Sequence, residues 1–277
     1  MKLSEGIIVK QKSNLYTVYD KKKTYECRAR GKFRNDKITP LVGDFCMFDK
    51  DDLYINSILD RKNELNRPHI ANVDYAIIMT SVKEPSLSLN LLDKELVCIL
   101  NENITPIICL SKMDLLNRDE LKSIKKIIKY YKSIGFIVLT NKNIRKLKKI
   151  LKNKTVVLTG QTGSGKSSLI NKLDKSLNLE TNEISKALGR GVHTTRHTQI
   201  YEIKGIFIAD TPGFSALDLN VRKDRLKELY PEFTHSRCKF DDCNHINTSK
   251  CSIIDDVNNG KILKSRYDNY VKFWGEL

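Results

Sequence analysis

Residues 160–167 read GQTGSGKS, which matches the phosphate-binding pattern G-x-x-x-x-G-K-[ST]. The apolar run 155–159 comes directly before it, and Leu169, Ile170 and Leu173 follow at helical spacing. Strand, glycine-rich loop and helix in this order let backbone N–H groups and a helix N-terminus face one anion. An ordinary glycine-rich turn is the alternative, and the flanking strand and helix argue against it. The sequence therefore predicts an α/β nucleotide-binding domain around this stretch.

The loop predicts a role for its side chains as well as its backbone. Lys166 is expected to reach the β- and γ-phosphates and to assist catalysis, and Ser167 to ligate Mg²⁺. The residues expected to contact the nucleotide here are Gly160, Gln161, Thr162, Gly163, Ser164, Gly165, Lys166, Ser167 and Ser168.

Outward from the loop, apolar runs alternate with amphipathic stretches, a pattern that predicts a parallel sheet with crossover helices. The expected strands are 73–80, 105–110, 136–140 and 155–159, and the expected helices are 87–101, 117–132, 143–151 and 166–177. A hairpin of 199–203 and 206–209 closes this domain, and a C-terminal helix starts near Val257.

Before this domain, residues 4–62 contain five short β-like runs, which predict a small barrel. Tyr16, Tyr19, Tyr25 and Phe33 alternate there with lysines and arginines. Such aromatics either stack on nucleic-acid bases or fill the barrel core.

Two further motifs indicate which nucleotide is bound. DTPG at 210–213 follows an apolar strand, so Asp210 is expected near Mg²⁺ and the Gly213 N–H near the γ-phosphate, although the same letters also fit a plain turn. SKMD at 111–114 is close to the guanine-reading N-K-x-D. Asp114 would accept from two guanine donors, with Lys112 and Met113 beside the base, unless Asp114 only caps a helix. Ser111 replaces the usual Asn, which leaves an ATPase open.

Three cysteines and one histidine near the C-terminus have spacing suited to a metal. Cys238, Cys243, His245 and Cys251 can complete a tetrahedral Zn²⁺ site with four protein ligands, which is typical of a structural site. Free thiols are the alternative. The other cysteines, Cys27, Cys46, Cys98 and Cys109, lie in apolar runs and are expected in the core.

Charge favours a polyanionic partner. The 277 residues carry a net charge of +16, of which residues 71–213 supply +10, and no acidic residue occurs from Leu121 to Leu173. The lysines of 122–154 either bind phosphate backbone or form a solvated face. No stretch is apolar and long enough to span a membrane, so we expect a cytoplasmic protein. We also expect a monomer.

These motifs have an unusual order, because SKMD precedes GQTGSGKS, GRGVHTTRHT (189–198) and DTPG. Together with NRPHIANVD (66–74), the barrel and the cysteine cluster, this order resembles the circularly permuted GTPase family RsgA. The resemblance implies a multi-domain chain: an all-β OB-fold barrel at 1–65, an α/β permuted P-loop GTPase domain at 66–218 and a zinc-binding domain with helices at 219–277. It also implies GTP and GDP binding, late maturation of the small ribosomal subunit with its rRNA as partner, and Thr194 or Thr195 as the switch threonine that closes on Mg²⁺.

Catalysis needs a group that orients the attacking water. Phe214 follows DTPG where Ras-like enzymes carry a glutamine, and a phenyl ring cannot hydrogen-bond water. His193 is the nearest candidate in sequence, unless it is only a solvated loop residue. We therefore predict slow hydrolysis alone and faster hydrolysis on the small subunit. The rival interpretations are a P-loop ATPase and an RNA-binding zinc protein with a regulatory nucleotide site.

Overall fold

The computed structural model describes residues 3–31, 33, 38–66, 69–174, 199–210, 219–234 and 236–277. They belong to two compact units, each described by itself. The first unit comprises Met1–Ile77, Asn143–Gly160 and Gly165–Ser215, and the second comprises Ile78–Lys142, Gln161–Ser164 and Ala216–Leu277. No helix of the described residues is both long and apolar enough to cross a membrane.

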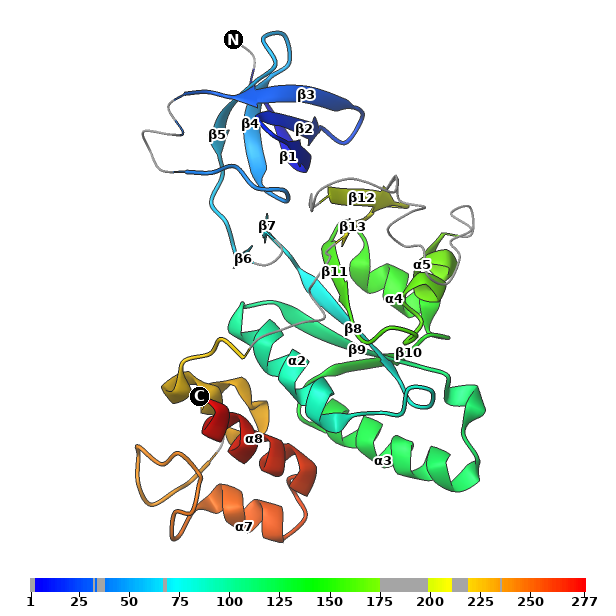
Figure 1. Cartoon of the computed structure of the whole chain (residues 1–277), viewed down its shortest axis with the longest axis vertical. Coiled ribbons are helices and arrows are strands. Elements are labelled where there is room, and N and C mark those ends of the chain that lie inside the picture. The colour runs from blue at the N-terminus through cyan, green and yellow to red at the C-terminus, as the bar shows by residue number, and fades with distance from the viewer. Residues whose placement is uncertain are drawn as a thin grey trace. The chain divides into compact units, whose positions relative to one another are not determined.

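The first unit begins with a closed five-stranded barrel (Figure 1). Its strands are β1 (Leu3–Lys12), β2 (Leu15–Tyr19), β3 (Thr24–Ala29), β4 (Phe45–Asp49) and β5 (Tyr54–Ile58). They follow the order β1-β2-β3-β5-β4, and β4 pairs back onto β1, which closes the barrel. The predicted all-β barrel is confirmed.

The barrel core is made by alternate side chains of these strands. Ile8, Val18, Phe48 and Ile55 are fully buried, as are Cys27 and Cys46. Tyr16 and Phe33 are also buried, so these two aromatics belong to the core and are not free to stack on bases. Cys98 and Cys109 lie in the core of the second unit, as expected.

After the barrel, the first unit contains β11 (Thr155–Thr159), β12 (Gln199–Ile203) and β13 (Ile206–Asp210), with α4 (Ile144–Leu151) and α5 (Lys166–Leu173). β11 and β13 are parallel, and β12 and β13 form the predicted antiparallel hairpin. α5 ends earlier than predicted, because Asp174 takes an extended backbone conformation.

A short hairpin that the sequence did not predict joins the barrel to this part. It consists of β6 (Glu64–Asn66) and β7 (His69–Ala71). Three-residue strands are too short to show a hydrophobic alternation, so the sequence carries no periodic signal for them.

The second unit contains β8 (Tyr75–Ser81), which starts in the first unit, together with β9 (Thr105–Ser111) and β10 (Ile137–Thr140) in the order β10-β9-β8. The helices are α2 (Leu89–Asn101) and α3 (Arg118–Ser133). β9 and β10 are parallel, as the alternating pattern predicts.

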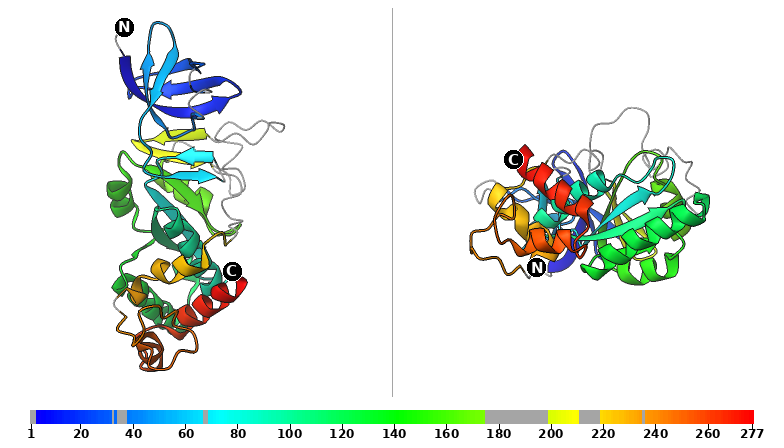
Figure 2. Two further views of the ribbon diagram at one scale, coloured as in Figure 1. Left: turned by 90° about the vertical axis from the view of Figure 1, so that its left-hand side faces the viewer. Right: turned by 90° about the horizontal axis from the view of Figure 1, so that it is seen from below.

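The C-terminal part of the second unit has two α-helices where the sequence predicted one. α7 (Ser252–Asn258) ends before Gly260, which has a left-handed φ of 71°, and α8 (Lys264–Glu276) follows. Val257 therefore lies inside α7 and does not start a helix, because the glycine ends the turn that contains it. α7 and α8 lie side by side (Figure 2) and share a core with the 3₁₀ helices η3 (Lys223–Leu229) and η4 (Pro231–Phe233).

Candidate functional site

The phosphate loop joins β11 to α5, as predicted. Gly160, Gly163 and Gly165 have φ values of 124°, 77° and 96°, which side-chain-bearing residues rarely adopt. The Lys166 Nζ donates to the Gly160 carbonyl over 2.6 Å. This contact holds the ammonium over the loop, where it could donate hydrogen bonds to the phosphates of a bound nucleotide. Ser167 is buried at the start of α5.

The SKMD segment is tied to the phosphate loop by a hydrogen bond. The Ser111 Oγ donates to the Ser164 carbonyl over 2.6 Å, and Ser111 is only 1% exposed. The two predicted nucleotide-contacting segments therefore meet in the second unit. The hydroxyl of Ser111 positions the phosphate loop. Serine therefore has a structural role here that does not depend on making the contacts of the asparagine in N-K-x-D.

Asp114 lies where it can contact a ligand. It is exposed in the 3₁₀ turn η1 (Met113–Leu115), and Lys112 before it has a left-handed φ of 58°. The Lys112 Nζ donates to the carbonyl of Glu84. The next helix, α3, is capped by Asn117 in a capping box with Glu120, so the alternative that Asp114 caps a helix is wrong.

β11 and β13 bring the other nucleotide motifs to one edge. They are parallel with Thr155 opposite Phe207 and Val157 opposite Ala209, so both carboxyl ends face the same way. Gly160 follows one strand and Asp210 ends the other, which is the edge where α/β folds bind ligands. His193, Thr194, Thr195, Gly213 and Phe214 lie outside the described residues, and of Asp210 only the backbone is described.

The Cys₃His cluster in the second unit has the geometry of a tetrahedral metal site. The four ligand atoms of Cys238, Cys243, His245 and Cys251 all lie within 4.8 Å of one another. The Nδ1 of His245 is 3.5 Å from the Sγ atoms of Cys238 and Cys251, which are 3.7 Å apart. A tetrahedron with ordinary Zn–S and Zn–N bonds has edges of about 3.6 Å and 3.8 Å. The residues therefore fit Zn²⁺, and four protein ligands would leave no open position.

The surroundings of the cluster favour the metal-binding form of its histidine and hold the ligand residues in place. Burial and then the charge of Lys227 lower the pKa of His245, which keeps the imidazole neutral. The backbone N–H of His245 donates to the Sγ of Cys243 over 3.4 Å. The Tyr267 hydroxyl donates to the His245 carbonyl over 2.8 Å, and the ring of Phe233 packs edge-on against the imidazole. These contacts fix the ligand loop on α8 and η4.

Close to the cluster, the second unit contains a fully buried ionic network that sequence reasoning missed. Arg266 of α8, with no exposed surface, donates to Asp93 of α2 over 2.8 Å and to Glu232 of η4 over 2.8 and 3.1 Å. Tyr131 and Asn269 also donate to Asp93, each over 2.6 Å. No local pattern distinguishes Arg266 from the exposed basic residues of α8, so this network could be found only from the tertiary structure.

Family models match both parts of the chain. The model of the RsgA GTPase matches residues 58–220, and that of the RsgA N-terminal domain matches residues 5–54. The chain belongs to the RsgA GTPase family. As an RsgA GTPase it is a GTP hydrolase, and the family resemblance of its motifs is confirmed.

Full-length relatives support the assignment. The small ribosomal subunit biogenesis GTPase RsgA of Latilactobacillus sakei is 42% identical over 99% of this chain and 96% of the relative. The small ribosomal subunit biogenesis GTPase RsgA 2 of Oceanobacillus iheyensis is 45% identical over 99% of this chain and 98% of the relative. The crystal structure of YjeQ from Thermotoga maritima matches with a TM-score of 0.87 at 34% identity over 100% and 99% of the chains. YloQ, described as a circularly permuted GTPase, matches with a TM-score of 0.85 at 35% identity over 99% and 95%.

Proposed function

We propose that this chain hydrolyses GTP on the small ribosomal subunit during late maturation of that subunit, and that it dissociates after hydrolysis. The observation that carries the proposal is that one chain combines a phosphate loop tied to an SKMD segment, a barrel and a Cys₃His cluster. Over 99% of its length this chain is 42% and 45% identical to relatives named for small-subunit biogenesis. We expect it to act in the cytoplasm as a monomer.

We propose that three domains contribute to this function. We propose domain bounds of 1–65 for the part that contains the barrel, 66–218 for the permuted GTPase domain and 219–277 for the zinc-binding domain. We propose that the barrel and the exposed lysines of α3 and α4 bind rRNA, because an exposed basic surface neutralises phosphates. The exposed basic residues on these helices and just after α4 are Arg118, Lys122, Lys125, Lys126, Lys129, Lys132, Arg145, Lys146, Lys149 and Lys152.

In the nucleotide site, the loop 160–168 would bind the phosphates and Asp114 the guanine. The loop amides and the Lys166 ammonium are donors, which suits an anion, while the exposed Asp114 carboxylate offers only acceptors, which suits the two guanine donors. Ser167, Thr195 and Asp210 would hold Mg²⁺, and the buried Ser167 at the start of α5 fits this role. Bound Mg²⁺ would neutralise charge that develops on the phosphates.

The attacking water would be oriented by His193. An imidazole in the segment that carries the switch threonine could hydrogen-bond this water when nucleotide and subunit are bound. Zn²⁺ held by Cys238, Cys243, His245 and Cys251 would have a structural role, since all four positions would be taken by protein atoms.

Nucleotide-dependent binding tests the proposal. Purified small and large ribosomal subunits are sedimented with the chain in the presence of a non-hydrolysable GTP analogue or GDP. We expect co-sedimentation with small subunits in the analogue state, and weaker binding with GDP or with large subunits. Equal binding in both nucleotide states, or to both subunits, would contradict the proposal.

A further inference from the structure

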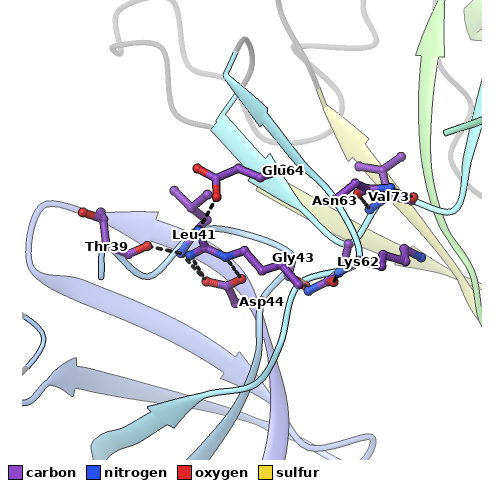
Figure 3. A network of polar contacts seen from close by, with 10 residues as sticks. Thr39, Leu41, Gly43, Asp44, Lys62, Asn63, Glu64 and Val73 are labelled. Carbon is purple, nitrogen blue, oxygen red and sulfur yellow. Dashed lines mark hydrogen bonds and ion pairs between the residues drawn. The ribbon is translucent and has the colours of Figure 1, made fainter. Parts of the chain in front are cut away.

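Within the first unit, a set of polar contacts joins the barrel to the strand that carries the phosphate loop. Figure 3 shows the part of this set that lies against the barrel. We call residues 61–66 and 69–74 the joint. It overlaps the NRPHIANVD segment (66–74), which belongs to neither the nucleotide site nor the zinc site. Its first contacts are to the barrel loop at residues 39–44, and its last are to Thr155 at the start of β11.

On the barrel side, the joint holds a buried carboxylate in a fork. Arg61 donates through Nε and a terminal nitrogen to the two oxygens of Asp44, both over 2.7 Å, and the Asp44 side chain has no exposed surface. The same guanidinium donates to the Thr39 carbonyl over 2.7 Å and to Glu64 over 2.5 Å. The Asp44 hydrogen bond is the main reason that the pKa of Arg61 is raised. Two parallel hydrogen bonds of this kind fix orientation as well as distance.

The backbone of the barrel loop lies directly against the joint. The Ala71 N–H donates to the Val42 carbonyl over 2.9 Å, and a Cβ at Gly43 would lie 2.1 Å from the Ala71 carbonyl oxygen. Asn72, 3% exposed with a left-handed φ of 58°, donates to the Gly43 carbonyl over 3.1 Å and accepts from the Lys62 N–H over 3.0 Å. The backbones of residues 42–43 and 71–72 therefore lie so close together that only glycine fits at position 43. Any movement of one segment along the other would break these hydrogen bonds.

On the nucleotide side, Asp74 forms a reciprocal contact with β11. Its N–H donates to the Thr155 carbonyl over 2.8 Å, and its Oδ2 accepts from the Thr155 N–H over 2.8 Å. Lys62 and Lys154 lie on its Oδ1 at 2.6 and 3.4 Å. β11 then runs to Gly160, roughly 16 Å away at the usual rise of a strand. A displacement of Asp74 therefore moves the strand that ends in the phosphate loop.

We propose that the joint couples the barrel to the phosphate loop, with Asp74 as a positioning residue, so that RNA bound by the barrel adjusts the nucleotide site for hydrolysis. This inference rests on the proposed function, because it needs RNA on the barrel and stimulation by the small subunit. It adds a route for that stimulation which does not pass through the segments that hold His193 and DTPG.

Two variants break the joint at its two ends, and each has a matched control. Asp74→Ala removes the side-chain half of the contact with β11 and leaves the backbone hydrogen bond to Thr155. Arg61→Gln removes the fork on Asp44. Lys62→Gln and Glu64→Gln each remove only a partly exposed ion pair with the same two residues, since Lys62 and Glu64 are 43% and 45% exposed. Basal GTP hydrolysis, subunit affinity and thermal unfolding are measured beside the stimulated rate.

We expect Asp74→Ala and Arg61→Gln to lower the stimulation by small subunits about fivefold, with basal rate and subunit affinity within about twofold of the parent. The double variant should be no worse than either single variant, because both cut the same connection. Asp74→Asn keeps an oxygen for the Thr155 N–H and should restore most of the stimulation. Lys62→Gln and Glu64→Gln should behave like the parent.

A second readout does not need the ribosome. By reciprocity, a nucleotide bound at the phosphate loop must act back on the barrel loop. Binding of a non-hydrolysable GTP analogue should slow hydrogen exchange at residues 41–44 in the parent and in Asp74→Asn, but not in Asp74→Ala. Parental stimulation and parental exchange changes in both folded joint variants would overturn the coupling. If the unaltered chain is not stimulated by small subunits, the proposed function fails, and the coupling falls with it.

Discussion

Arg266 is the side chain whose loss should harm stability most. It is fully buried and balances two carboxylates, Asp93 and Glu232. Arg266→Ala leaves these charges buried without their partner, which typically costs about 3–5 kcal/mol of unfolding free energy. Urea unfolding followed by the fluorescence of Trp274 measures the change. Lys264→Ala on the same helix removes a 79% exposed lysine and should change stability by no more than about 0.5 kcal/mol; equal losses would contradict this view of the network.

Asp114 should decide which base is bound. Asp114→Asn replaces an acceptor by a donor, so GTP should bind about 10- to 100-fold more weakly, while xanthine nucleotides, with a second carbonyl, should gain. Competition binding with GTP, ATP and XTP measures the change. Asp119→Asn in the first turn of α3 is the control and should leave selectivity unchanged. Equal affinity of the unaltered chain for GTP and ATP would contradict a guanine site.

His193 should affect the stimulated rate and little else. His193→Ala is expected to keep GTP affinity and subunit binding but to lose about 2–4 kcal/mol of transition-state stabilisation in the stimulated reaction. His197→Ala, four residues further on, is the matched control. A stimulated rate of His193→Ala within about twofold of the parent would assign water orientation to another group.

At the scale of elements, the basic surface of α4 should contribute to RNA affinity through charge. Lys146, Lys149 and Lys152 are exposed, whereas Lys148 is half-buried. Replacing the first three by Gln should reduce the log–log salt slope of rRNA binding by about 0.7–0.9 for each phosphate that is no longer neutralised. The control replaces Lys261, Lys264 and Lys272, which are paired with acidic residues. An unchanged slope would assign α4 to a solvated face.

The metal should hold the C-terminal elements together. The cluster loop is fixed to α8 by Tyr267 and Tyr270, so chelation should unfold α7 and α8 while GTP still binds. Structural zinc can supply on the order of 10 kcal/mol of apparent binding energy. His245→Ala should abolish stoichiometric zinc, measured by elemental analysis, and His235→Ala should not. A chain purified without chelator that contains no zinc would refute the site.

How far the sequence predicts these elements depends on the range of the interactions that form them. The phosphate loop, the barrel and α2 to α4 follow from local periodicity and turn residues, and the three helices form within a few residues of their predicted ends. The Cys₃His ligands were identified by residue type and spacing. The left-handed turn at Gly260, which divides the C-terminal helix in two, is a local feature that helical spacing alone did not reveal.

Other features could not be read from the sequence because they join distant residues. The bond between Ser111 and Ser164, the Arg266 network and the contacts of Arg61 with Asp44 connect segments that only the folded chain brings together. NRPHIANVD was visible as a motif, but its role depends on the position of Gly43 and Thr155. Polar networks inside a fold therefore remain the part that sequence patterns predict least.

The molecule as a whole is expected to be a GTP hydrolase whose rate the small ribosomal subunit controls. The most direct measurement is phosphate release from GTP by the full chain alone, with purified small subunits and with large subunits, beside a Lys166→Ala variant. We predict slow release alone, an increase of at least about tenfold with small subunits only, and none from Lys166→Ala. The same rate with and without small subunits would show that the subunit does not control hydrolysis.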